Sequence, residues 1–153
     1  MKTKKRKIGD LGEGIACNYL KNKGFKIIDQ NYWKPWGEID IIAEKQGIVY
    51  FVEVKSVTRG TCLPAGKHFE NVSVPQLEKG PQRRPSSLTG HVTNQRNPAD
   101  NLHPWKLKRL ARTIQSYIFR YNLEKEWKFL AVIVYLNIKD KTAKVELLEN
   151  IVL

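Results

Sequence analysis

Hydrophobic and polar residues follow two different periods along this chain, and the two periods separate helices from strands. Apolar residues that recur every three or four positions predict helices over residues 10–23 and 104–122. Short apolar runs bounded by residues that favour turns predict strands instead. The predicted strands are residues 25–33, 38–44, 48–57, 127–138 and 142–148. We therefore expect an α/β fold with the element order αβββ, then an insertion, then αββ.

The ends of these elements carry further local signals. Asp10 is a suitable N-cap for the first helix, and Gly24 suits the position just after its last turn. Gly12 and Gly14 each weaken that helix by about 1 kcal/mol relative to alanine, which indicates a close backbone approach at this point. The third strand is apolar on both faces over most of its length, so we expect it to be central in its sheet.

Two segments lack this periodicity. Residues 1–7, MKTKKRK, predict a basic, disordered tail, which is either a solubilising end or an arm that contacts phosphates. Residues from about 58 to 103 are rich in Pro, Gly, Ser, Asn and Gln, and predict a largely disordered insertion within a single domain over 8–153. Four metal-binding residue types lie at or near the insertion, namely Cys62, His68, His91 and His103. Their spacings match no common zinc pattern.

The net charge of +12 favours polyanionic partners, nucleic acid first and an anionic membrane surface second. No terminal helix is amphipathic and rich in Trp or Phe, which counts against the membrane surface. The longest uninterrupted apolar run, residues 129–136, is too short to span a bilayer, so we expect no membrane partner. Two cysteines are too few for a disulfide framework and favour the reducing cytoplasm.

Three charged residues interrupt the apolar strands. Asp40 lies in the second strand, whereas Glu53 and Lys55 share one face of the third strand because side chains alternate. If the two strands pair through the turn at Gln46-Gly47, Asp40 and Glu53 converge near one end of the sheet. Neighbouring carboxylates repel unless a cation lies between them, and such hard oxygen ligands suit Mg²⁺ or Mn²⁺. Spacing alone is also compatible with a solvated ladder of salt bridges.

The motifs that contain these charges resemble those of a known family. G-E-I-D-I-I-A at residues 37–43, followed by V-Y-F-V-E-V-K at 49–55, resembles the YraN-like bacterial proteins. The similarity extends to G-D-L-G-E-G-I-A-C-N-Y-L at 9–20 and K-L-K-R-L at 106–110. That family belongs to the restriction-endonuclease-like, or PD-(D/E)xK, nuclease superfamily. The resemblance implies a restriction-endonuclease-like core, in which helices flank a mixed β-sheet.

The resemblance also implies roles for individual residues. In the superfamily, the acids that match Asp40 and Glu53 bind a divalent ion, Mg²⁺ or Mn²⁺, and the carbonyl that matches Val54 is a further ligand. The lysine that matches Lys55 positions or activates the attacking water. A glutamate of the first helix, here Glu13, often joins the site directly or through water.

Two of the matching helix residues have a simpler alternative. Glu13 also fits a capping box with Asp10, in which the two residues satisfy backbone N–H groups at a helix start. Lys106 matches a basic position of the family, which is compatible with a phosphate contact, but it also fits an ordinary solvated helix lysine. The residues predicted to bind nucleic acid are Lys34, Lys106, Lys108, Arg109 and Arg112.

Together these features predict a Mg²⁺-dependent endonuclease that hydrolyses phosphodiester bonds in DNA. Branched or junction DNA is favoured by analogy, because related resolvases share this core. The main alternative is a non-catalytic nucleic-acid-binding scaffold with a vestigial site, which predicts the same fold and the same basic surface. Assembly as a homodimer is left open by the sequence.

Overall fold

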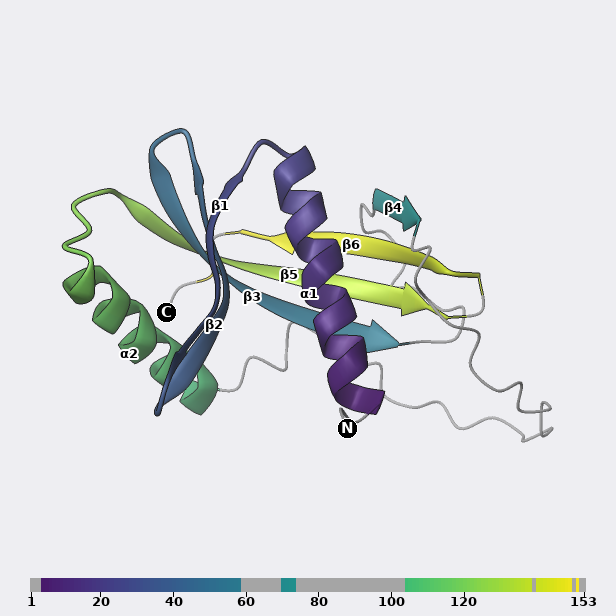
Figure 1. Ribbon diagram of the computed structural model, residues 1–153, viewed down its shortest axis with the longest axis horizontal. Helices are drawn as coiled ribbons and strands as arrows, with labels where there is room; N and C mark the ends of the chain where they lie inside the picture. The colour runs from purple at the N-terminus through teal and green to yellow at the C-terminus, as the bar shows by residue number, and fades with distance from the viewer. Residues whose placement is uncertain (1–3, 59–69, 74–103, 139, 150, 152–153) are drawn as a thin grey trace.

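The computed structural model describes residues 4–58, 70–73, 104–138, 140–149 and 151. Two helices and six strands make up this part of the chain (Figure 1). The helices are α1 (Lys4–Asn22) and α2 (Pro104–Arg120). The strands are β1 (Lys26–Lys34), β2 (Gly37–Lys45), β3 (Ile48–Thr58), β4 (Glu70–Ser73), β5 (Trp127–Asn137) and β6 (Thr142–Leu148).

All six strands form one mixed sheet in the order β1-β2-β3-β5-β6-β4. Consecutive strands β1, β2 and β3 pair antiparallel, as do β5 with β6 and β6 with β4. Only β3 and β5 are parallel, and α2 connects them across the sheet. The expectations of an α/β fold, of a central third strand and of a hairpin formed by the last two strands are therefore confirmed.

The short strand β4 was not predicted. It lies inside the segment that we expected to be a largely disordered insertion, and it pairs with β6 at one edge of the sheet. The backbone hydrogen bonds of an edge strand do not require an apolar pattern in its side chains, which explains why the periodicity did not indicate it. The remaining residues of the predicted insertion lie outside the described part, and so do the four candidate zinc ligands.

Two separate apolar cores lie on opposite faces of the sheet. On β5, Leu130 and Val132 pack in the core beneath α1, whereas Phe129 packs in the core beneath α2. Because side chains alternate along a strand, this division places the two helices on the two sides of the sheet. Figure 1 shows α1 crossing the sheet and α2 lying beside the end formed by β1 and β2. Neither described helix is long and apolar enough to cross a membrane.

The first helix begins earlier than the apolar pattern indicates. Helix α1 starts at Lys4, so residues 4–7, which we expected to belong to a disordered tail, are helical, and Asp10 is not its N-cap. Lysine and arginine are good helix formers but carry no apolar period, so periodicity cannot detect such a turn. The end of α1 is as expected, because Gly24 has φ +84° and the N–H of Phe25 donates to the carbonyl of Leu20 at 3.0 Å.

Two glycines allow the helices to approach the sheet closely. A Cβ on Gly12 would lie only 1.7 Å from Oγ of Ser56 on β3, whereas one on Gly14 would meet nothing within 4 Å. The close approach expected in this helix is therefore confirmed for Gly12 alone. A Cβ on Gly37, at the start of β2, would lie 2.6 Å from Oγ1 of Thr113 on α2. Both contacts fix a helix beside the charged part of the sheet.

Candidate functional site

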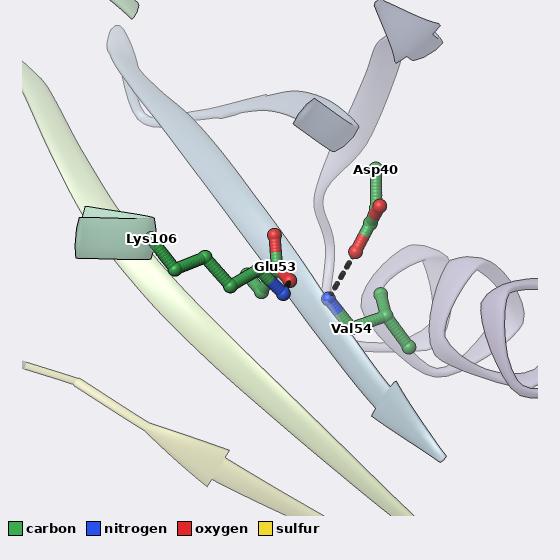
Figure 2. Close-up of polar contacts among 4 residues, drawn as sticks. All are labelled: Asp40, Glu53, Val54 and Lys106. Carbon is green, nitrogen blue, oxygen red and sulfur yellow. Dashed lines mark hydrogen bonds and ion pairs between the residues drawn. The ribbon is translucent and has the colours of Figure 1, made fainter. Parts of the chain in front are cut away.

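The candidate site lies where β2 and β3 stop pairing. Their ladder ends at Ile41 opposite Val52, so Asp40 and Glu53 occupy the next position on each strand. Beyond this point the N–H of Val54 donates to Oδ2 of Asp40 at 2.6 Å (Figure 2). A side chain thus replaces the backbone partner that β2 no longer provides, which satisfies a partly buried donor. The convergence expected from the Gln46-Gly47 turn is confirmed.

The backbone of β2 is irregular at Asp40. Ile39 and Ile42 both pack in the core beneath α2, whereas Ile41 packs in the core beneath α1. Simple alternation would place Ile39 and Ile41 on the same face of the sheet. The alternation of side chains along β2 is therefore interrupted at Asp40. On the neighbouring strand, Asn31 lies level with Asp40 and has φ +53°, an uncommon conformation that asparagine tolerates better than most residues.

Glu53 is buried, with 6% of its surface exposed, and its carboxylate pairs with a lysine from the other side of the insertion. Figure 2 shows Lys106 reaching from α2 so that its Nζ meets Oε1 of Glu53. The two residues are 53 positions apart in the sequence. This ion pair comes from outside the sheet, so it is not part of a ladder along the strands.

Electrostatics link Asp40 to its neighbours. Burial raises the pKa of Asp40 to about 8, and the nearby charge of Glu53 adds to the rise. The N–H of Val54 and the charge of Lys106 act in the opposite direction but do not cancel it. Lys55 is also affected, because burial and the charge of Lys106 lower its pKa. The structure therefore gathers two acids and two lysines within mutual electrostatic range at one end of the sheet.

Glu13 approaches the same region from α1. Burial raises its pKa, and the charges of Asp10, Glu38 and Glu53 add to the effect, while a side-chain hydrogen bond with Asn31 lowers it. The capping-box alternative is wrong, because α1 begins at Lys4 and Glu13 lies well inside the helix. A partly buried glutamate in a helix interior, close to other acids, needs a different explanation.

A pocket of 230 Å³ opens directly onto the acids. Its lining includes Asp40 and Glu53, the start of β2 and the first turns of α2. The complete lining is Gly37, Glu38, Asp40, Glu53, Trp105, Lys106, Arg109 and Leu110. Of the predicted nucleic-acid-binding residues, Lys106 and Arg109 therefore belong to the pocket.

The other predicted basic residues lie outside the pocket lining. The guanidinium of Arg112 stacks 4.6 Å from the ring centroid of Trp36, and Lys34 lies 5.3 Å from that of Tyr32. Lys108 is exposed on α2. Arg112 lies on α2, which lines the pocket, whereas Lys34 ends β1 and pairs with Gly37 of the lining, so the basic residues extend beyond the site.

Three residues of this site were missed as candidates. Asn31 interacts with Glu13, and Glu38 and Trp105 line the pocket. An asparagine inside a strand is a weak signal for a left-handed residue. Glu38 was visible within the G-E-I-D motif, but its motif position alone gave it no role. Trp105 carried no signal, because a tryptophan beside apolar helix positions usually belongs to the core.

Comparison with known proteins places the chain in a family. The family model described as "Uncharacterised protein family UPF0102" matches residues 12–79, which include Glu13, Asp40, Glu53 and Lys55. A UPF0102 protein of Helicobacter pylori strain J99 is 31% identical over 151 residues, which cover 99% of this chain and 96% of the relative. A Helicobacter hepaticus relative is 30% identical over 145 residues, covering 95% of this chain and 94% of that protein.

A third relative is more similar over a shorter stretch. The UPF0102 protein of Campylobacter lari is 58% identical over 48 residues, or 31% of this chain and 43% of that protein. The two Helicobacter matches, in contrast, extend over nearly the whole of both chains. This protein belongs to the UPF0102 family, the family of the YraN-like proteins.

Proposed function

We propose that this protein is a metal-dependent nuclease with a restriction-endonuclease-like core, which hydrolyses phosphodiester bonds in DNA. One observation carries the proposal: Asp40 and Glu53 converge where β2 and β3 separate, and their proximity helps to raise the pKa of Asp40 to about 8. Two acids held together at a cost in free energy, beside an open pocket, are typical of a functional site.

The donor atoms of this site fit a divalent ion of the Mg²⁺ class. Among the described residues, no three acidic, histidine or cysteine side chains are close enough to enclose a metal ion. Mg²⁺, however, commonly takes one or two carboxylates and completes its shell with water and phosphate oxygens. Asp40 and Glu53 provide that number, and the carbonyl of Val54 points to the same side of β3 as the N–H that meets Asp40.

Each residue of the site has a distinct role in the proposed reaction. When bound, the divalent ion would polarise a phosphoryl oxygen and lower the pKa of a water molecule. Lys55, on the same strand as Glu53, would orient the attacking water and neutralise developing negative charge. Glu13 would accept a hydrogen bond from a water at the α1 side of the site, where Asn31 already fixes its carboxylate.

Lys106 gives the site a cation of its own. In this structure its ammonium neutralises Glu53, and it also lines the pocket. An incoming phosphate and a divalent ion would together take over these interactions, so Lys106 can turn from the carboxylate to the phosphate. The net charge of +12 favours a polyanionic substrate, and branched or junction DNA is suggested by analogy with other nucleases of this fold class.

A nucleic-acid-binding scaffold is the second candidate, and one observation favours it. An ion pair with Lys106 can stabilise the buried Glu53 without any metal. The scaffold predicts binding to nucleic acid with no requirement for a divalent ion. Cleavage and its metal dependence therefore separate the two candidates.

The test is incubation of the purified protein with single-stranded, duplex, flapped and four-way DNA in Mg²⁺, Mn²⁺ or EDTA. We expect cleavage only with a divalent ion, and its loss in Asp40→Asn and Glu53→Gln. Lys55→Ala should retain metal binding while turnover falls by about 10²–10³-fold, as for removal of one preorganised electrostatic group. Glu44→Gln, a change on β2 at an ion pair with Lys125, is the matched control and should cleave normally. Metal-independent binding without cleavage of any substrate would favour the scaffold.

A further inference from the structure

The pocket beside the acids has a wall that no catalytic role explains. Asp40 and Glu53 contribute acidic groups to its lining, and the first turns of α2 contribute Trp105 and Arg109. At 230 Å³ the pocket is smaller than the roughly 300–1,000 Å³ that are typical of sites for drug-sized ligands. Its volume and mixed lining suit one flat, partly polar group.

The wall is held in place before any ligand arrives. Nε of Arg109 donates to the carbonyl of Trp36 at 2.5 Å, which ties α2 to the turn between β1 and β2. Gly37 packs directly against α2, since a Cβ there would lie 3.3 Å from the carbonyl of Arg109. The guanidinium of Arg109 lies 5.6 Å from the ring centroid of Trp105. The planar cation of Arg109, held by the carbonyl of Trp36, therefore lies over the aromatic ring of Trp105.

Trp105 is costly to leave in contact with water, yet 55% of its surface is exposed. Six large apolar side chains are exposed in the described part: Ile28, Trp33, Trp105, Phe119, Tyr121 and Trp127. Of these, only Trp105 lines the pocket. Exposed aromatic rings beside basic side chains are the usual means by which proteins bind unpaired bases, because every base offers a face that can stack.

We infer that this pocket binds the base of an unpaired nucleotide next to the phosphate that is cleaved, with the base stacked on Trp105. The inference rests on the proposed function and makes its substrate class more specific. A base inside a duplex is already stacked on both faces and hydrogen-bonded at its edge, so it cannot reach this wall without leaving the helix. The substrate strand is accordingly single-stranded or splayed at the site of cleavage.

The phosphate and the base then have separate binding groups. Lys106 and Arg109 provide positive charge on the α2 side of the pocket, where Asp40 and Glu53 alone would repel a phosphate. Trp105 lies one position before Lys106, so a single turn of α2 meets both parts of one nucleotide. Sequence readout is not required, because stacking tolerates any base.

The test measures binding by fluorescence anisotropy in two conditions. In EDTA each variant is measured as it is, and in Mn²⁺ each variant is measured in a Lys55→Met background. The probes are a labelled 12-nucleotide single strand of DNA, its RNA equivalent and the blunt DNA duplex of the same sequence. Trp105→Ala should weaken binding of the single strand by about five- to a hundredfold and that of the duplex less than twofold. Trp105→Phe should retain most of the affinity. Trp33→Ala removes another exposed tryptophan, which lies outside the pocket lining. This variant should change neither the affinity for the single strand nor the affinity for the duplex.

Intrinsic fluorescence gives a second readout. Stacking should quench part of the tryptophan emission of the wild type on the single strand, and Trp105→Phe should abolish that part. Equal losses of affinity on single strand and duplex, or no loss with Trp105→Ala, would overturn the inference. The binding and fluorescence measurements need no turnover. A protein that never cleaves DNA but shows the Trp105 effect would therefore refute the proposed nuclease activity and support the inferred base pocket. The RNA and DNA arms identify which strand the pocket prefers.

Discussion

The two halves of β3 differ in almost every respect, although they are parts of one strand. From Val49 to Val52 the strand pairs with β2 on one side and β5 on the other, and Phe51 is fully buried. From Glu53 onward it pairs with β5 alone in the described ladders, and its side chains include Glu53 and Lys55. Charges are tolerated in a central strand because its neighbour leaves it at that point. Where β2 no longer pairs with β3, there is room for a pocket, and the N–H of Val54 can donate to Asp40.

The largest expected effect separates the two halves by stability. Phe51→Ala should lower the free energy of unfolding by about 3–5 kcal/mol, because it removes a buried ring that packs on Tyr117 and Trp127. Glu53→Gln should change it by less than about 1 kcal/mol, because the lost ion pair with half-exposed Lys106 is offset by relief of repulsion from Asp40. Urea denaturation of both variants measures the difference. Similar losses of unfolding free energy in the two variants would show that both halves of β3 stabilise the fold to the same extent.

The second effect is a dependence of stability on pH. In the metal-free protein the pKa of Asp40 is about 8, whereas an unfolded aspartate has a pKa of about 3.9. Between these values the folded state holds a proton that the unfolded state has released, so stability falls as the pH rises. The slope approaches about 1.4 kcal/mol per pH unit, and the raised pKa of Glu13 acts in the same direction.

Asp40→Asn should remove the part of that slope that comes from Asp40 and keep an oxygen for the N–H of Val54. Urea denaturation in EDTA at pH 5, 6, 7 and 7.5 should show a variant that becomes increasingly more stable than the wild type. Asp140→Asn, in an exposed turn, is the control and should follow the wild type at every pH. A difference between Asp40→Asn and wild type that stays constant with pH would contradict the electrostatic account.

A smaller effect tests how α1 is joined to the charged half of β3. Gly12→Ala places a methyl group against Ser56, and this overpacking should lower stability by about 1–2 kcal/mol despite the better helix propensity of alanine. Gly14→Ala, in the same helix but with open space around its Cα, should instead raise stability by up to about 1 kcal/mol. Thermal unfolding compares them directly. The same sign for both variants would mean that the contact between α1 and Ser56 is loose.

The smallest effect concerns Lys106, whose ammonium group pairs with Glu53 in the site. Lys106→Met should raise the affinity for Mn²⁺ several-fold, because Glu53 no longer pairs with an ammonium group, and it should weaken DNA binding. Lys108→Met, in the same turn of α2 but outside the pocket lining, should leave the affinity for Mn²⁺ unchanged. Titration calorimetry with Mn²⁺ measures both. A lower affinity in Lys106→Met would mean that the lysine supports metal binding instead of competing with it.

The sequence predicts those parts of the structure that depend on neighbouring residues. Hairpin register follows from the turn at Gln46-Gly47, where both residues have positive φ, and this register brings Asp40 level with Glu53. The early start of α1 and the strand β4 were missed because neither depends on an apolar period. The pairing of Lys106 with Glu53 was not predicted, since no local pattern encodes a contact across 53 positions.

The parallel pairing of β3 with β5 also determines the order in which the site can be assembled during synthesis. Strands β1, β2 and β3 are consecutive and form hairpins, so Asp40 and Glu53 can meet as soon as residue 58 has left the ribosome. Lys106 follows much later, and β5, which holds α2 against the sheet through the crossover, later still. The nascent chain therefore carries two opposed carboxylates before it carries their lysine. Until α2 docks, a proton on Asp40 relieves the repulsion between the two carboxylates of this hairpin.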